Sequence, residues 1–344
     1  MNKITLVGVD LAKSTFHVHA VDAGGALVKR AKFSAGKLTE WLAQLPPCVV
    51  AMEACGGSNH WARVCVRVGH VPKLIAPQYV RAYVKTNKND FVDAAGIVEA
   101  ASRPAMRFVA LKDEGQQVLQ GLHRVRSQII QQRTALSNQL RGLLLEFGVS
   151  LPKGQAGFNR VLVVVAEEVS LPARLRQLVE EQYAAWRGLS ERLASYEREL
   201  EGLARTDDRC RRLMTIPGVG PLTATALVAA VSDVAVFERG REMAAWLGVV
   251  PRQASTGGVP RLLGISKRGD CYLRTLFIHG ARAALRVAAK KTDRRHRWAH
   301  ALEQRKGRNL AAVALANKNI RTAWALLRYG TTYRMGEARA VDAA

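Results

Sequence analysis

Two long stripes of apolar side chains constrain the middle of this 344-residue chain more than any other feature. In residues 118–147, and again in residues 175–203, apolar residues recur in steps of three and four, which places them along one face of a helix. Each stripe has one polar residue at a seam position, Gln132 in the first and Gln182 in the second. The spacing predicts an antiparallel, coiled-coil helical hairpin over residues 111–205. Pairing of the two glutamine side chains across the seam is a hypothesis.

The residues before this hairpin, 1–110, predict an α/β domain with a mixed sheet. Short apolar or alternating segments bounded by turns indicate strands, and helical segments lie between the later ones. The strands are expected at residues 4–11, 16–21, 26–31, 48–53 and 71–76. Three meandering strands followed by alternating helices and strands are typical of such a domain.

Four acidic residues lie where a ligand site is expected in this domain. Asp10 ends the first strand and Glu53 ends the fourth. Asp90 and Asp93 open a late helix one turn apart, so both carboxylates face the same way. Such a group suits two Mg²⁺ ions about 4 Å apart, which assist phosphodiester cleavage, and Mn²⁺ is an alternative ion. Singly, each acid could instead be a turn or helix-capping residue. Basic or capping candidates just before the helix are Lys85, Asn87, Lys88 and Asn89.

A Pro-Gly-Val-Gly turn joins two helical segments after residue 206. The turn contains Gly218 and Gly220, and the pattern matches a helix-hairpin-helix. In that motif, backbone N–H groups of the turn bind a nucleic-acid phosphate without reading the bases. A plain helical hairpin with a glycine turn is the alternative.

A polar loop further along places hydroxyls, glycines and cations together. A serine beside glycines can approach a phosphate as a nucleophile, and arginines can stabilise the charge of a phosphoryl transition state. Without further support, Ser-Thr-Gly-Gly is more often a turn. The candidate residues are Arg252, Ser255, Thr256, Gly257, Gly258, Arg261, Lys267, Arg268 and Arg274.

Charge indicates a polyanionic partner. The formal net charge is +24 and the sequence pI is about 10.5, with most of the excess in the last third, so nucleic acid is the simplest partner. The basic stretch 290–297, beside Trp298, could contact a nucleic-acid backbone. Five cysteines without zinc-finger spacing, no signal-peptide layout and no long apolar run favour a cytoplasmic, nucleoid-associated protein with no membrane contact.

Three blocks of sequence resemble DEDD transposases of the insertion sequence 110 family, in its IS1111-like group. They are Val9-Asp10-Leu-Ala-Lys13 with Met52-Glu53-Ala54, then Lys88-Asn-Asp90-Phe-Val-Asp93-Ala94, then Pro251-Arg-Gln-Ala-Ser-Thr-Gly-Gly with Gly-Ile-Ser-Lys-Arg-Gly-Asp. The blocks occur in the family's order, and the resemblance covers nearly the whole chain. Asn89 replaces the usual Thr before the first helix aspartate, and Pro260 stands where relatives often have a basic residue.

The resemblance implies a RuvC-like, RNase H-like domain that holds Mg²⁺ on the four acids. It also implies a mostly α-helical C-terminal transposase domain whose nucleophile is Ser255. If the alignment with the family were shifted by one residue, the nucleophile would be Thr256. A homo-oligomer, dimer or tetramer, would form composite sites across subunits. It would act on the DNA of the element ends and the target, and a structured noncoding RNA of the element would guide it.

These expectations amount to a DNA recombinase that cuts and rejoins strands through a serine–DNA covalent intermediate with Mg²⁺ assistance. The expected domains are residues 1–110, 111–205 and 206–335, followed by a tail at 336–344. One rival is a RuvC-like, metal-dependent endonuclease that uses activated water, with Ser255 only as a phosphate ligand. The other is a non-enzymatic architectural DNA-binding protein whose acids are helix caps.

Overall fold

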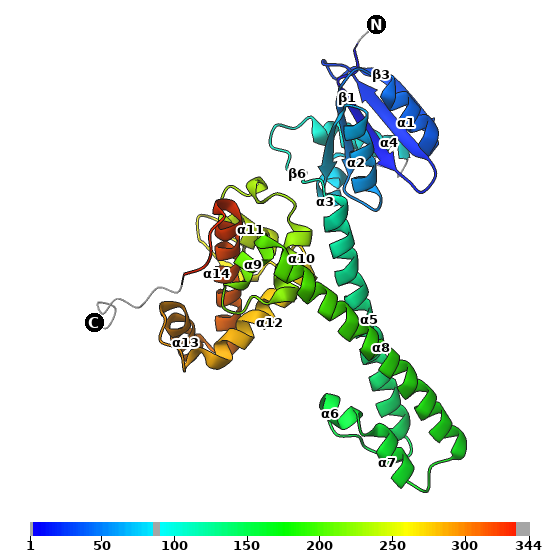
Figure 1. Ribbon diagram of the computed structural model, residues 1–344. Helices are drawn as coiled ribbons and strands as arrows, with labels where there is room; N and C mark the ends of the chain where they lie inside the picture. Colours follow the sequence, from blue (N-terminus) through cyan, green and yellow to red (C-terminus); the bar gives the residue numbers. More distant parts are fainter. Residues whose placement is uncertain (1–2, 85–89, 335–344) are drawn as a thin grey trace, which may run out of the picture. The chain divides into compact units, whose positions relative to one another are not determined.

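The computed structural model describes residues 3–84 and 90–334, and the chain divides into two compact units, Met1–Glu114 and Gly115–Ala344 (Figure 1). The boundary lies close to the one expected at residue 110. The second unit contains both the helical hairpin and the C-terminal helices. The basic and capping candidates at 85–89 lie outside the described residues. Among the helices that the structure describes, none has both the length and the apolarity needed to cross a bilayer.

The first unit is built on a mixed sheet with the strand order β3-β2-β1-β4-β5-β6. β1, β2 and β3 form an antiparallel meander, β4 and β5 run parallel to β1, and β6 is antiparallel to β5. This order is compatible with an RNase H-like domain. The strand bounds are Leu6–Leu11 (β1), Phe16–Val21 (β2), Leu27–Phe33 (β3), Val49–Glu53 (β4), Val71–Ile75 (β5) and Phe108–Val109 (β6). β6 is too short to leave a sequence pattern, and it was not predicted.

Helices cover both faces of this sheet (Figure 1). Helices α1 (Ala35–Ala43) and α2 (Ser58–Arg67) pack against one face, and α4 (Asp90–Ala101) packs against the other. Val7 and Val9 of β1 belong to the core beneath α1 and α2. Because side chains alternate along a strand, Gly8 and Asp10 lie on the α4 face. The short α3 (Pro77–Val80) and the 3₁₀ turn η1 (Arg81–Tyr83) precede α4.

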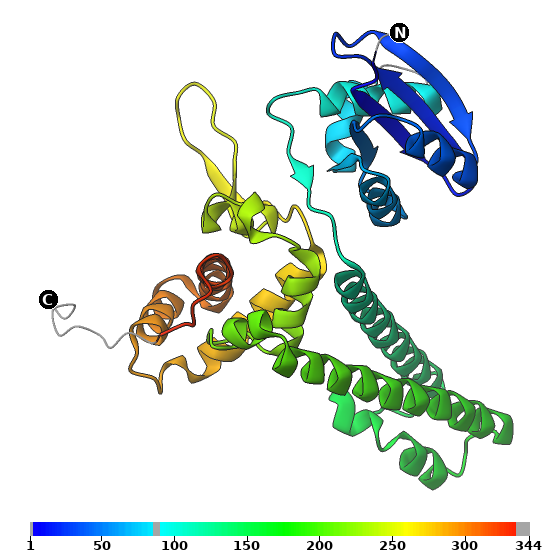
Figure 2. The ribbon, with the colours of Figure 1, turned by 45° about the horizontal axis from the view of Figure 1, so that its top comes forward.

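Two long antiparallel helices begin the second unit, as the stripes predict (Figures 1 and 2). α5 spans Glu114–Leu145 and α8 spans Ala173–Thr206. Arg126 of α5 donates from Nε and Nη2 to Glu197 Oε1 of α8, at 3.0 and 2.6 Å. Two short helices that the sequence did not predict, α6 (Gly154–Phe158) and α7 (Val161–Glu167), pack at the far end around a core shared with both long helices.

The predicted seam is wrong in detail. Gln132 is exposed, and no hydrogen bond joins it to Gln182 among the described residues, so the structure gives the proposed amide pair no support. Val118, the first residue of the predicted stripe, is 65% exposed. Steps of three and four residues along the stripe predict that Leu143 faces the seam, but its neighbour Leu144 is the residue that is fully buried. A strict 3.5-residue repeat drifts around a straight helix of 3.6 residues per turn, so the buried positions shift along its length.

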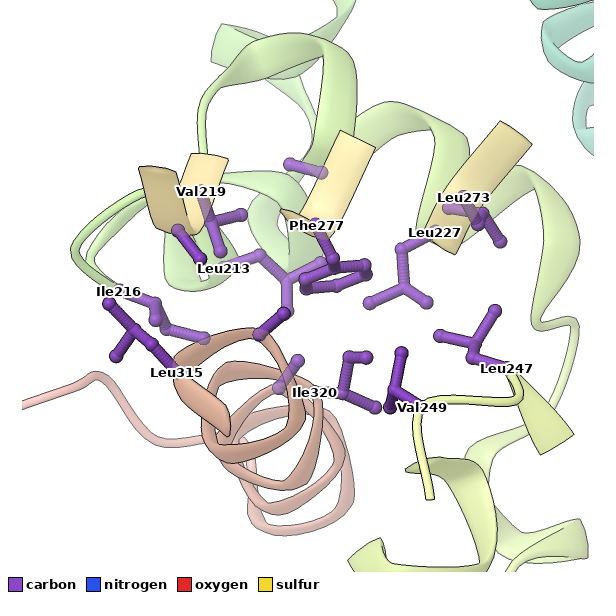
Figure 3. Packing of buried hydrophobic residues seen from close by; sticks show 14 of the residues in the cluster. Leu213, Ile216, Val219, Leu227, Leu247, Val249, Leu273, Phe277, Leu315 and Ile320 are labelled. Carbon is purple, nitrogen blue, oxygen red and sulfur yellow. The ribbon is translucent and has the colours of Figure 1, made fainter. Parts of the chain in front are cut away.

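The C-terminal helices of this unit surround one apolar core (Figure 3). Phe277 of α12 lies near the middle of this cluster, close to Leu227 of α10 and Ile320 of α14. The helix bounds are Asp208–Met214 (α9), Pro221–Ala230 (α10), Gly240–Trp246 (α11), Cys271–Ala288 (α12), Arg294–Lys306 (α13) and Arg308–Tyr329 (α14), with a 3₁₀ turn at Val234–Val236 (η2).

The predicted polar loop and the basic stretch 290–297 both contain regular structure. The serine-containing polar loop is a β-hairpin of β7 (Pro251–Gln253) and β8 (Leu262–Ile265), which extends away from the helices of this unit (Figure 2). The basic stretch 290–297 enters α13 after Asp293, whose carboxylate accepts hydrogen bonds from the backbone N–H groups of Arg295 and His296. Both of those side chains are buried, so they do not belong to an exposed basic linker.

Candidate functional site

Three of the four predicted acids come together on the α4 face of the sheet. Asp10 at the end of β1 and Asp90 and Asp93 at the start of α4 each offer one carboxylate oxygen, and these oxygens all lie within 4.8 Å of one another. Carboxylate oxygens gathered in this way are the hard ligands that divalent cations take in proteins. The donor set therefore agrees with the predicted metal centre.

Gly8 explains how α4 comes close enough to β1. A Cβ atom at this position would lie 2.5 Å from the Ala94 carbonyl oxygen and 2.7 Å from Val98 Cγ2. Only glycine lets the helix backbone approach the strand this closely. The approach places the first turn of α4, and with it Asp93, beside Asp10.

Glu53 borders the cluster and is not one of its three members. It ends β4, which pairs in parallel with β1, so the two strand ends lie side by side. Burial raises the pKa of Asp10, and the charges of Asp93, Asp90 and Glu53 raise it further, while His17 acts in the opposite direction. These acids therefore repel one another electrostatically, and a bound cation would relieve that repulsion.

His17 is a site residue that the sequence did not reveal. The β1–β2 register places it directly opposite Asp10, and its Nδ1 atom lies 3.6 Å from Asp90 Oδ2. The residue is buried, and its Nδ1 has no hydrogen-bond partner among the residues that the structure describes. Its ring meets the Phe91 ring edge-on at 4.6 Å. Apolar and polar residues alternate along β2, which predicts that the side of the strand carrying His17 faces solvent. The start of α4 covers that side, and this contact cannot be predicted from the local sequence.

The predicted serine nucleophile lies near the tip of the β7–β8 hairpin. Gly257 and Gly258 both have positive φ, +58° and +76°, and Thr256 pairs with Val259 on either side of them. Two positive φ angles define a type I′ turn, the two-residue connection that suits the twist of a hairpin. The turn geometry alone thus accounts for both glycines.

Ser255 is exposed, and its Oγ accepts two hydrogen bonds. Gln253 Nε2 donates to it at 2.9 Å and the Arg261 backbone N–H at 3.2 Å. Because both partners are donors, they favour negative charge on Oγ and leave its own hydrogen free to be donated. Among the described residues, no hydrogen bond reaches Thr256 Oγ1, and the choice of Ser255 over Thr256 as the nucleophile stays a prediction.

The predicted cations around this serine divide into two groups. Arg252 and Arg261 are exposed on the hairpin, and Lys267 and Arg268 are exposed just after it. Arg274 is only 8% exposed, and its Nη1 donates to the carbonyl oxygens of Leu247 and Arg268 at 3.1 and 2.9 Å. Its assignment as a nucleic-acid ligand is therefore corrected: it ties the loop after the hairpin to the end of α11.

The turn of the predicted helix-hairpin-helix lies between α9 and α10. Gly218 has φ +87°, and a Cβ atom there would lie 2.5 Å from the Gly280 carbonyl oxygen of α12. Packing against α12 therefore requires this glycine. Gly220 is exposed at the start of α10, and its role in binding phosphate stays a prediction.

Two separate parts of the chain match models of transposase families. A model described as "Transposase", for the DEDD transposases of IS110 elements, matches residues 7–148 and so includes all four acids. A model described as "Transposase IS116/IS110/IS902 family" matches residues 210–297 and so includes the serine hairpin.

Whole-length relatives carry similar names. The chain is 49% identical to a "Probable family 20 transposase" of Pseudomonas aeruginosa, over 97% of this chain and 99% of the relative. It is 44% identical to the "Transposase for insertion sequence element IS1111A" of Coxiella burnetii, over 98% and 93%. It is also 43% identical to the "Transposase for insertion sequence element IS1328" of Yersinia enterocolitica, over 97% and 99%.

Proposed function

This chain belongs to the IS116/IS110/IS902 family of transposases, enzymes that cut and rejoin DNA, and we propose that it does so with a metal-binding acidic site and a serine nucleophile. The observation that carries the proposal is the convergence of Asp10, Asp90 and Asp93 within 4.8 Å. Asp10, Asp90 and Asp93, with Glu53 beside them, would hold divalent cations. When bound, these cations would neutralise charge on the oxygens of the scissile phosphate.

Ser255 is the proposed nucleophile. Its Oγ gives up its proton and forms a bond to phosphorus while the bond from phosphorus to the departing strand breaks. The departing oxygen takes up one proton and leaves as a hydroxyl, so no net proton is gained or lost. Attack by an incoming strand's hydroxyl then reverses the step and frees Ser255. The number of phosphate ester bonds is unchanged, so no nucleotide hydrolysis is needed. The hydrogen bonds from Gln253 and the Arg261 N–H, together with the exposed Arg252 and Arg261 side chains, support this role.

Sequence recognition is proposed to come from a noncoding RNA of the element. The net charge of +24 suits the binding of RNA and DNA backbones, and base pairing would then supply the specificity. Sequencing the RNA that co-purifies with the full chain tests this part. A single structured RNA species is expected, and a random mixture of cellular fragments would contradict the guide proposal.

Trapping a protein–DNA adduct tests the chemistry. Wild-type protein with an element-end substrate and Mg²⁺ should give an adduct that survives denaturing electrophoresis. Ser255→Ala should abolish it, whereas Thr256→Ala, the matched control, should retain it. Asp90→Asn should abolish it too, with folding checked by circular dichroism. If Ser255→Ala still cuts the DNA and leaves free ends without an adduct, the enzyme is instead an endonuclease that uses activated water.

A further inference from the structure

A groove of about 1260 Å³ runs along one face of α14 in the second unit. Val313, Asn317 and Arg321 of α14 form its floor, and the start of α11 forms one wall. At Gly240 the two helices are in backbone contact, because a Cβ atom there would lie 2.9 Å from the Arg321 carbonyl oxygen. Pro251 and residues 263–265, at the base of the β7–β8 hairpin, form another wall.

The groove is cationic. Its lining, all of it within the described part of the chain, contains Arg239, Arg241, Lys318 and Arg321 and no aspartate or glutamate. Burial, followed by the charges of nearby arginines including Arg321, lowers the pKa of Lys318. These like charges lack an acidic partner in the groove, and an anionic ligand would neutralise them.

The lining of the same groove also contains aromatic and apolar side chains. Trp298 and Trp324 line it, and Lys318 Nζ lies 4.2 Å from the centroid of the Trp298 ring. Leu310 and Leu263, also in the lining, are 51% and 38% exposed. Cations that contact phosphates, interleaved with aromatic and apolar side chains that contact bases, are the combination that single-stranded nucleic acid requires. A duplex hides its base faces and would leave this apolar surface unused.

The position of the groove indicates which strand would fill it. Pro251 and Ile265 end the hairpin whose tip carries Ser255, and Arg252 directly follows Pro251. We propose that the α14 groove binds an unpaired DNA segment adjoining the strand that Ser255 attacks. The choice of DNA rests on the proposed role of Ser255. The choice of a single strand rests on the charge and composition of the lining.

Binding of a fluorescein-labelled 15-mer of deoxythymidine to the full chain, followed by anisotropy, tests the proposal. Every protein carries Ser255→Ala, so no covalent step can contribute. Arg321→Ala should weaken binding by roughly fivefold or more and lower the salt slope by about 0.7. Arg328→Ala is the matched control, because it removes an exposed arginine of the same helix outside the groove, and it should change affinity less than twofold.

A 15-mer of ribouridine and a 15-base-pair DNA duplex complete the experiment, with thermal melting to confirm that each variant folds. Arg321→Ala should weaken binding of the DNA single strand more than binding of either of the others. Equal losses in the two arginine variants would overturn the groove as a site. A loss confined to the RNA would overturn the choice of DNA. Failure of the serine mechanism would show only in the adduct assay and leave these affinities unchanged.

Discussion

His17 has a buried imidazole directed toward one of the acids that would hold the metal. Nδ1 lies 3.6 Å from Asp90 Oδ2 and has no hydrogen-bond partner within residues 3–84 and 90–334, so a small movement of the carboxylate would form a bond that orients Asp90. Outer hydrogen bonds of this kind usually change metal affinity by about 10- to 100-fold. His17→Gln should therefore weaken Mn²⁺ binding by about tenfold, measured by calorimetry in the absence of DNA.

His19→Gln is the control for this prediction. His19 lies two residues further along β2, opposite Gly8 and not opposite Asp10. Its substitution should leave the Mn²⁺ affinity within about twofold of wild type. Equal affinities for wild type and His17→Gln would mean that the imidazole only fills space beneath α4.

Arg274 shows why residue type alone was insufficient for the predicted phosphate ligands. An arginine within a basic block is compatible with a phosphate contact, but Arg274 follows the N-terminus of α12 and turns inward to two carbonyl groups. A buried guanidinium needs such acceptors, and the ends of nearby segments supply them. Arg252 and Arg261, on an exposed hairpin, have no such constraint.

Among the elements, the contact between β1 and α4 controls the acidic site. Gly8→Ala would place a Cβ atom 2.5 Å from the Ala94 carbonyl oxygen, so α4 must move away from the strand. We expect a loss of about 2 kcal/mol in the free energy of unfolding, from urea denaturation, and weaker Mn²⁺ binding because Asp93 moves with the helix.

Gly36→Ala provides the matched comparison. Gly36 is in α1 of the same unit, and a Cβ atom there meets nothing within 4 Å. Since alanine is the better helix former, this variant should be as stable as wild type or up to about 1 kcal/mol more stable, with normal metal binding. A stable Gly8→Ala protein with unchanged metal affinity would disprove the close-approach argument.

His123 makes the contact between α5 and the C-terminal helices sensitive to pH. Its ring nitrogens lie 3.0 Å from Thr225 Oγ1 of α10 and from the Tyr272 hydroxyl of α12. Burial, and then the charge of Arg126, lowers the pKa of His123 to about 4. The folded state thus favours the neutral ring, so its stabilising contribution is complete above the ordinary pKa of 6.5 and is lost as pH falls toward 4.

The expected size of this pH effect is about 2 kcal/mol between pH 7 and pH 4.5. The measurement is the drop in the free energy of unfolding between these two pH values. Wild type should show a larger drop than His123→Gln, whose side chain does not titrate, and the difference between the two drops is the contribution of His123. Comparing the pH dependence of the unfolding free energy in the two proteins removes the contribution of the histidines that both contain. Parallel pH profiles for the two proteins would show that His123 is not the responsible group.

For the whole molecule, the resemblance predicts oligomers in which the acids of one subunit act with the serine of another. Asp90→Asn and Ser255→Ala should each abolish recombination when purified alone. If the protein is a dimer, mixing and re-associating the two variants should recover roughly a quarter of wild-type activity. About half of the dimers then contain one subunit of each variant, and in each of these one of the two composite sites has both intact acids and an intact serine. Asp90→Asn mixed with Asp93→Asn is the control, since no acidic site is then intact. If neither mixture recovers activity, composite sites are excluded.

Much of the chain was predictable because it depends on local order. Alternation and apolar runs identified five of the six strands in the described sheet, and three- and four-residue steps identified both long helices. Strand ends and helix starts located Asp10, Glu53, Asp90 and Asp93. Such patterns need only neighbours along the chain, because the periods of helices and strands are properties of the backbone.

The amino-acid order by itself thus determined the elements, the excess of positive charge and the residue types available for catalysis. The tertiary structure decided which of them meet. It brought α4 against Gly8 so that three acids converge, covered His17, turned Arg274 inward and left Ser255 exposed on a hairpin. These outcomes depend on contacts between residues far apart in the chain, which arise from packing and burial and leave no period in the sequence.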